Sequence, residues 1–121
     1  MAIDESRYTP VKSIDYLVKK DFERKQVELG GIPRGAISLG NDVFVAQLDD
    51  KTGLVELTGL FRGNNDWNRS EIAVSRLNAL ESMGESVAVS GTYYSRNPKT
   101  GNRGIEVNSI RDQYGYRIEC I

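Results

Sequence analysis

The chain has 121 residues, of which 39% are hydrophobic and 27% charged, and its 16 basic and 17 acidic side chains give a net charge of −1. This size and composition are typical of one globular domain and exclude collagen, coiled coil and wholesale disorder. The chain has no histidine and a single cysteine, Cys120. A Cys/His zinc site, an intramolecular disulfide and a histidine base are therefore excluded, and we expect no metal and no cofactor.

The sequence also bears on where the protein works. It holds no run of about 20 apolar residues, the length that crosses a bilayer. The first residues, Met1 to Thr9, are polar with mixed charge and lack the apolar region of a signal peptide. We therefore expect a cytoplasmic protein that makes no membrane contact.

Three segments are expected along the chain. Residues 1–12 carry no periodicity and are predicted to form a flexible arm. Residues 13–31 are predicted to form a helix, and residues 32–121 an OB-like barrel domain.

The helix prediction depends on apolar residues that recur at helical spacing between charged ones from Ser13 to Leu29. Ser13 suits the N-cap, and Gly30 and Gly31 followed by Pro33 are a strong stop signal. The pattern predicts an amphipathic helix, with a strand over residues 13–18 as the alternative. Its basic residues, Lys19, Lys20, Arg24 and Lys25, are balanced by acidic neighbours, which favours a solvated face.

After Pro33 the pattern is that of β-structure. Between Leu54 and Arg62 apolar and polar residues alternate, as in a half-buried antiparallel strand. A helix is predicted to begin near Asn68, which stands three residues before Glu71 as in a capping box, and to end at Gly84. The predicted strands are residues 36–39, 43–48, 54–62, 85–95, 105–110 and 116–121.

Three strands, a helix and two strands form the order of an OB-type barrel, although other small β folds share it. The predicted fold class is therefore mainly β with two helices: a five-stranded OB-type Greek-key β-barrel with an added N-terminal amphipathic helix. Phe44 and Phe61 are expected in its core.

Three stretches carry a family resemblance: VELTGLFRG at residues 55–63, LNALESMGESVAVSG at residues 77–91, and a hairpin with a polar tip over residues 93–107. They resemble the third strand, the helix with the fourth strand, and the last hairpin of the bacterial single-stranded DNA-binding proteins. The resemblance covers residues 53–110. It implies an OB barrel that binds single strands and works in DNA replication.

The sequence differs from that family in two respects, and both bear on the role that we expect for the protein. About 30 residues precede the first expected barrel strand, and the family's acidic C-terminal tail is not seen. We therefore expect an accessory binder, or one that a mobile element encodes. The first helix or the barrel is expected to serve a homo-oligomer.

The polar tip of the last hairpin is basic. Residues 86–105 hold Arg96, Lys99 and Arg103 and no acidic residue. Binding of single strands without sequence choice needs cations that follow the phosphates and aromatic faces for the bases. The adjacent Tyr93 and Tyr94 must point to opposite faces of their strand. Parity with the apolar strand positions places Tyr93 in the core and leaves Tyr94 for stacking.

The predicted nucleic-acid interface therefore consists of Tyr94, Arg96, Lys99 and Arg103, helped by Arg62; the alternative is that the basic tip is only a solvated loop. The single tryptophan, Trp67, is a further candidate. It either stacks on a base beside Arg69 or packs as a hydrophobic staple on the next helix.

No enzyme is expected. The adjacent acidic pair Asp49 and Asp50 stands in a turn sequence, and no phosphate-binding loop or nucleophile motif occurs. Two hypotheses from different classes stay open. The first is a binder of single-stranded DNA or RNA, and the second is a protein–protein interaction or inhibitor module. An isoelectric point near 5.5 favours the second hypothesis.

Overall fold

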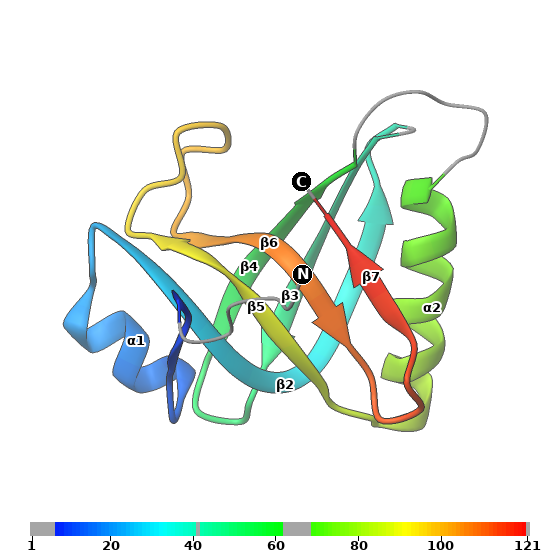
Figure 1. The fold of residues 1–121 in the computed structure, drawn as a ribbon, viewed down its shortest axis with the longest axis horizontal. Coiled ribbons are helices and arrows are strands. Elements are labelled where there is room, and N and C mark those ends of the chain that lie inside the picture. The colour runs from blue at the N-terminus through cyan, green and yellow to red at the C-terminus, as the bar shows by residue number, and fades with distance from the viewer. Residues whose placement is uncertain (1–6, 41, 62–68, 121) are drawn as a thin grey trace.

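A computed structural model describes residues 7–40, 42–61 and 69–120. Within these residues the chain is mainly β with two helices (Figure 1). The helices are α1 (Ile14–Lys20) and α2 (Arg69–Met83). The strands are β1 (Thr9–Pro10), β2 (Arg24–Ser38), β3 (Val43–Asp49), β4 (Leu54–Leu60), β5 (Val87–Tyr94), β6 (Gly104–Arg111) and β7 (Arg117–Glu119).

Five of the strands close a barrel. They pair in the order β2-β3-β4-β6-β5, and β2 pairs again with β5. Neighbours in the barrel are antiparallel except β4 and β6, which are parallel. This order and these directions are consistent with an OB-type barrel. The short strands β1 and β7 add to β2 and β6.

The long strand β2 makes the closure possible. Its first half, residues 24–31, pairs with β5, and its second half, from Ile32 to Ser38, pairs with β3. The strand passes from one partner to the other at Gly31, where a Cβ would lie 2.9 Å from the Asp49 carbonyl oxygen. Glycine is therefore needed for this close approach between backbones.

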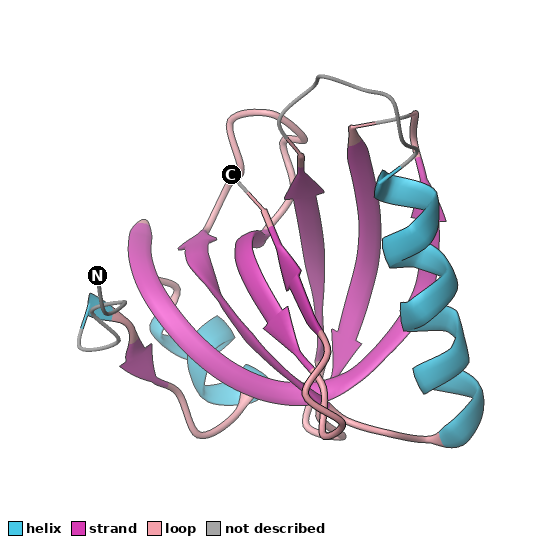
Figure 2. Cartoon of the chain, turned by 45° about the vertical axis from the view of Figure 1, so that its right-hand side comes forward, coloured by secondary structure: helices cyan, strands magenta, loops and turns pink. Residues whose placement is uncertain are grey.

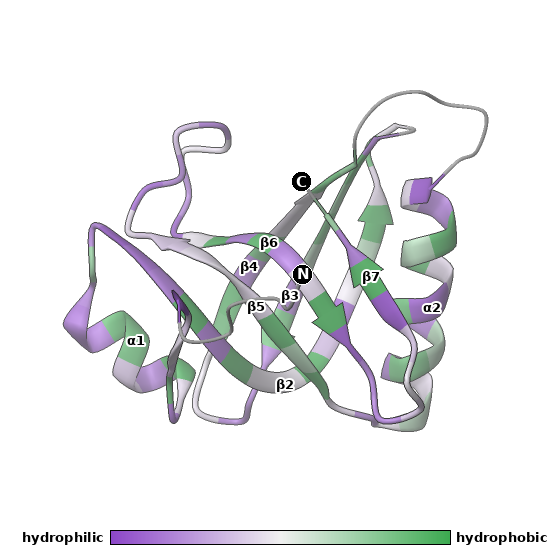
Figure 3. Cartoon of the chain, in the orientation of Figure 1, coloured by the Kyte–Doolittle hydropathy of each residue, from purple (hydrophilic) through white to green (hydrophobic). Residues whose placement is uncertain are grey.

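Side chains that alternate between the two faces of each strand form the core of the barrel. Side chains of one parity point inward and are buried, as Val55 and Leu57 on β4 and Val87 and Val89 on β5 are. Figure 3 shows this as short apolar bands that interrupt the polar ribbon. Phe44 and Phe61 are buried as expected, with ring centroids 5.8 Å apart.

Helix α2 covers one side of the barrel, where it packs against β2 and β3 (Figure 2). It buries Ala73, Leu77 and Leu80, and Gly84 follows it with φ of +67°, as predicted for its C-terminal stop. No helix among the described residues is long and apolar enough to cross a membrane.

The helix predicted over residues 13–31 is wrong beyond Lys20. Ser13 caps α1 as expected, and Ile14 and Leu17 are buried against the barrel of the same chain. From Arg24 onward the chain is strand, because Val27 and Leu29 are buried two residues apart and pair with β5. The two glycines read as a stop are inside β2. Within the expected flexible arm, residues 9–10 pair with β2 as β1.

Candidate nucleic-acid interface

The loop between β5 and β6, residues 95–103, is here called the hairpin loop. Two backbone hydrogen bonds close its tip: Asn97 N–H donates to Asn102 O at 2.8 Å, and Gly101 N–H donates to Asn97 O at 2.7 Å. The Asn97 side chain accepts from Lys99 N–H at 2.8 Å. Gly101 has φ of +78°, a conformation that glycine adopts without cost. The predicted basic tip is thus an ordered turn.

The two tyrosines before this loop divide as predicted. Tyr93 is fully buried, and its hydroxyl donates to Asp21 Oδ1 at 3.1 Å. Burial, together with the carboxylate of Asp21, raises the pKa of Tyr93 to about 12. Tyr94 faces outward and is half-buried. Its ring is therefore available at the surface, which is what base stacking needs.

A shallow depression surrounds Tyr94. It is lined by Glu23, Arg24, Tyr94, Ser95, Arg96 and Pro98. Arg24 stands opposite Tyr94 in the β2–β5 ladder. Both arginines are exposed, and neither forms an ion pair with a described residue. The depression therefore brings together one aromatic side chain, one carboxylate, Glu23, and two arginines that form no ion pair with a described residue.

Arg24 was missed as an interface residue by sequence reasoning, which placed it on the solvated face of a helix. The signal that could have found it is the alternation of polar and apolar residues from Gln26 to Leu29, directly after Arg24. Read as a strand, this stretch carries Arg24 to the edge of the barrel beside β5.

Lys99 and Arg103 are held differently. Lys99 Nζ lies 3.3 Å from Glu106 Oε1, and Arg103 Nε lies 3.3 Å from Asp21 Oδ1. All four side chains are partly exposed, and ion pairs of this kind contribute about 0–1 kcal/mol. The structure thus separates the four predicted hairpin residues into two pairs: Tyr94 and Arg96 share the depression, whereas Lys99 and Arg103 are paired with acids. The predicted Arg62 and Trp67 lie outside the described residues.

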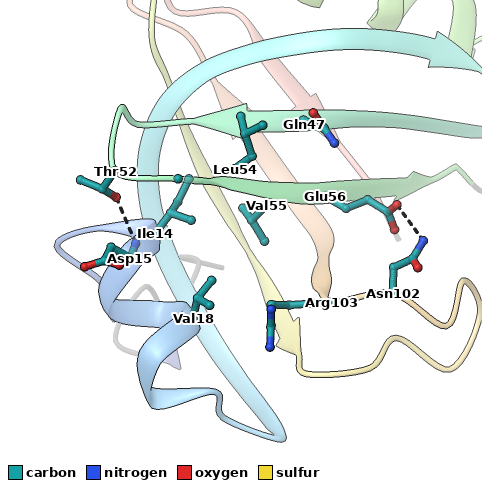
Figure 4. Close-up of a pocket in the computed structure, with 11 residues that line it drawn as sticks. Ile14, Asp15, Val18, Gln47, Thr52, Leu54, Val55, Glu56, Asn102 and Arg103 are labelled. Atoms are coloured by element: carbon teal, nitrogen blue, oxygen red, sulfur yellow. Dashed lines mark hydrogen bonds between the residues drawn. The ribbon is translucent and has the colours of Figure 1, made fainter.

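A second pocket lies between α1, the strands β3 and β4, and the hairpin loop (Figure 4). Its apolar lining comes from Ile14 and Val18 of α1 and from Leu54 and Val55 of β4. Its polar lining has both charges, with Glu56 on one side and Arg103 on the other. No aromatic side chain lines it. This pocket is therefore unsuited to base stacking.

The hairpin loop is tied to β4 beside this pocket. Asn102 Nδ2 donates to Glu56 Oε2 at 3.2 Å. Three polar atoms, Glu56 Oε1, Thr58 Oγ1 and Asn97 Nδ2, are buried with no hydrogen-bond partner among the described residues. Each such atom costs about 1–3 kcal/mol. The contact between the hairpin loop and β4 therefore leaves two buried polar atoms, Asn97 Nδ2 and Glu56 Oε1, without hydrogen bonds to described residues.

Helix α1 is fixed at both ends. At its start, Asp50 Oδ2 accepts from Ile14 N–H at 2.7 Å and Thr52 Oγ1 accepts from Asp15 N–H at 3.0 Å. Burial acts to raise the pKa of Asp50, but hydrogen bonds from the Thr52 side chain and from the backbone lower it overall. At its end, Asp21 binds Tyr93 and Arg103. The helix is thus attached both to the β3–β4 turn and to the base of the hairpin loop.

The same contacts explain the acidic pair. Asp49 Oδ1 accepts from Lys51 N–H at 2.8 Å, and Asp50 Oδ1 accepts from Thr52 N–H at 2.9 Å. The prediction that these residues form a turn is confirmed. Among the described residues, no group of three or more acidic or cysteine side chains is placed to hold a metal ion.

Charge is segregated along the chain. Residues 7–25 and 94–103 together hold nine basic and three acidic side chains, a net +6, and the rest of the sequence therefore carries −7. The Arg24–Tyr94 pairing and the Arg103–Asp21 ion pair bring the two basic segments together. The near-neutral total thus conceals a cationic region around α1 and the hairpin loop.

The comparisons with known proteins concern the fold. No protein-family model matches the chain, and no curated protein matches it. Among solved structures, one described as RecG bound to a three-way DNA junction is similar, with a TM-score of 0.57 and 20% sequence identity. The match covers 94% of this chain and 14% of that one. The chain therefore belongs, by its architecture, to the closed five-stranded β-barrel domains, and it spans about one seventh of the protein it resembles.

Proposed function

We propose that the chain is a non-catalytic nucleic-acid-binding domain of the OB type and that it binds single-stranded DNA. The observation that carries the proposal is the depression that Arg24, Tyr94 and Arg96 line together. Single-strand binders combine stacking on aromatic rings with cations along the backbone. The similar barrel in a protein bound to a DNA junction supports the same class of ligand.

In this proposal a base stacks on Tyr94, and the phosphates on either side of it meet Arg24 and Arg96. Lys99 and Arg103 join by exchanging Glu106 and Asp21 for phosphate oxygens. This exchange costs little because the ion pairs are partly exposed. Each phosphate contact adds about −0.7 to the slope of log affinity against log salt for a single strand.

The test is fluorescence anisotropy with labelled oligo-dT and oligo-U at two salt concentrations. We expect Tyr94→Ala to weaken binding by about 5- to 150-fold, which corresponds to the loss of about 1–3 kcal/mol for one stacked base. Arg24→Ala and Arg96→Ala should each reduce the salt slope by about 0.7. Arg117→Ala is the matched control, because it removes one exposed positive charge from β7.

Two results would refute the proposal. One is no binding by the folded wild-type protein at low salt and on the order of 100 µM protein, the weak end of non-specific binding. The other is binding that the Arg117 control weakens as much as the Arg24 and Arg96 variants do. Tighter binding of oligo-U than of oligo-dT would keep the class of ligand but replace DNA with RNA.

A second candidate is a protein-docking module, and the pocket of Figure 4 favours it. That pocket has apolar residues from α1 and β4, charges of both signs and no aromatic ring. Such a lining suits a short peptide segment better than it suits bases. Absence of nucleic-acid binding in the anisotropy test would make this candidate the leading one.

A further inference from the structure

A second aromatic group with cations lies on α1, outside the depression around Tyr94. The Lys12 Nζ and Lys20 Nζ atoms are 5.1 Å and 5.8 Å from the centroid of the Tyr16 ring. The ring is half-buried and both lysines are exposed. Neither lysine forms an ion pair with a described residue. We call Lys12, Tyr16 and Lys20 the α1 cationic face.

The geometry of α1 separates this face from the acidic residues of the helix. Ile14 and Leu17 point into the barrel core, and Asp15 lines the pocket of Figure 4, where it pairs with Lys19 at 3.2 Å. Tyr16 and Lys20 are four residues apart and therefore share one side of the helix. That side carries no acidic side chain of α1.

The α1 cationic face lacks a partner of opposite charge. Two ammonium groups near one ring are each attracted by its π face but repel each other. An anion between or beside them would relieve that repulsion, and no described carboxylate takes this place. In a polynucleotide, bases and phosphates alternate. The Tyr16 ring can stack on a base while Lys12 and Lys20 bind the neighbouring phosphates.

The α1 cationic face also leads toward the depression around Tyr94. Only three residues separate Lys20 from Arg24, so their Cα atoms are at most about 14 Å apart. Between them Phe22 has Lys25 Nζ at 4.8 Å from its ring centroid. Because both ends of α1 are fixed to the barrel, the helix holds its face in a set position relative to the hairpin loop.

We infer that the α1 cationic face is a second subsite for a nucleic-acid strand, which extends the strand held at Tyr94 past Phe22 and over Tyr16. This inference rests on the proposed function, since it concerns the length and path of the same ligand. A short oligonucleotide fills the Tyr94 depression alone, and a longer one engages Lys12 and Lys20 as well.

The experiment compares a labelled dT oligomer of about 4 nucleotides with one of about 12 nucleotides, within the range of strand lengths that single barrels occupy. The variants are the double change Lys12→Ala with Lys20→Ala, and Tyr16→Leu. Lys19→Ala is the control, because Lys19 pairs with Asp15 and is not one of the two lysines near the Tyr16 ring. Circular dichroism establishes that each variant is folded.

For the longer oligomer we expect the double lysine variant to reduce the salt slope by about 1.4, as two lost phosphate contacts would. Tyr16→Leu should weaken binding of that oligomer at least fivefold, and Lys19→Ala should leave both quantities unchanged. None of these changes should affect the shorter oligomer. Equal salt slopes for the double variant and the Lys19 control would overturn the inference, as would equal losses for both oligomers.

The outcomes separate this inference from the proposed function. If wild-type protein binds neither oligomer, both are overturned. If Arg24→Ala and Arg96→Ala weaken binding of both oligomers while the α1 variants bind the longer one normally, only the second subsite is overturned. The α1 inference is supported when its variants act on the longer oligomer alone.

Discussion

The contact between Phe44 and Gly59 gives the sharpest test of how the barrel is packed. The two residues are opposite each other on β3 and β4, and the Phe44 ring lies over the glycine. A Cβ at position 59 would lie 2.1 Å from Phe44 Cε1 and 2.4 Å from Cζ. Carbon atoms in contact are about 3.5–4.0 Å apart, so the ring would have to move by more than about 1 Å.

Phe44 has little freedom to make that movement, because its side chain is completely buried and lies beside Phe61. Overpacking a tight core costs about 1–3 kcal/mol, and we expect Gly59→Ala to lower the free energy of unfolding by about 3 kcal/mol. With a slope of about 2 kcal/mol per molar urea, the midpoint of urea unfolding would fall by about 1.5 M. Circular dichroism during urea titration measures it.

A double-mutant cycle with Phe44→Leu isolates the cause. Once the ring is gone, the added methyl group at position 59 has room, so Gly59→Ala should cost less than about 1 kcal/mol in that background. Gly30→Ala is the control for the loss of a strand glycine, since a Cβ there meets only Val87 O, at 3.4 Å. A Gly59 variant that is no less stable than the Gly30 variant, or costs that simply add in the cycle, would refute this account of the packing.

Three further predictions follow from the contacts of the free protein. Glu106→Gln should remove the carboxylate that competes with phosphate for Lys99 and tighten oligo-dT binding by up to about fivefold, since the ion pair contributes about 0–1 kcal/mol; weaker binding of this variant in anisotropy would contradict this. Asp50→Ala should remove the acceptor for Ile14 N–H and cost about 1 kcal/mol in urea unfolding. The pKa of Asp50 is lower in the folded protein than its unfolded value of about 3.9. The Asp50 carboxylate therefore stabilises the folded protein above that unfolded pKa, and this contribution is lost as the pH falls through the folded-state pKa. The Asp50→Ala variant lacks this contribution, so its free energy of unfolding should fall less in acid than that of the wild-type protein. Burial raises the pKa of Cys120 to about 12, and its thiol should react with an alkylating reagent at pH 8 far more slowly in folded than in urea-unfolded protein; equal rates would show that it is accessible.

The parts of the fold that local sequence patterns determine were predicted well. Burial alternates along β3 and over the first half of β4, the turn at Asp49 and Asp50 carries its own hydrogen-bond acceptors, and Gly84 ends α2. Tyr93 could be placed in the core by parity alone. Each of these features depends on residues that are neighbours in the sequence.

Features that depend on distant residues were missed. The strand character of residues 24–31 comes from pairing with β5, whose partner residues lie 56 to 70 positions later, and two glycines and a proline hid it. The partner of Arg103 is Asp21, 82 residues away, so no local pattern could show that this arginine is paired while Arg96 is not. The candidate site in the structure therefore lies where the sequence predicted it, at the hairpin loop, but it includes Arg24, which the sequence analysis had not assigned to it.

The division of β2 between two partners also bears on how the chain is made. During synthesis from the N-terminus, residues 32–38 can pair with β3 soon after they emerge, but residues 24–31 must wait for β5. At about 5–20 residues per second, that interval lasts several seconds on the ribosome. The waiting segment holds Arg24, Lys25 and Glu28 beside its apolar positions, and charges of this kind discourage pairing with a neighbouring nascent chain. Arg24, which we assign to ligand binding in the finished barrel, thus also protects its unfinished edge.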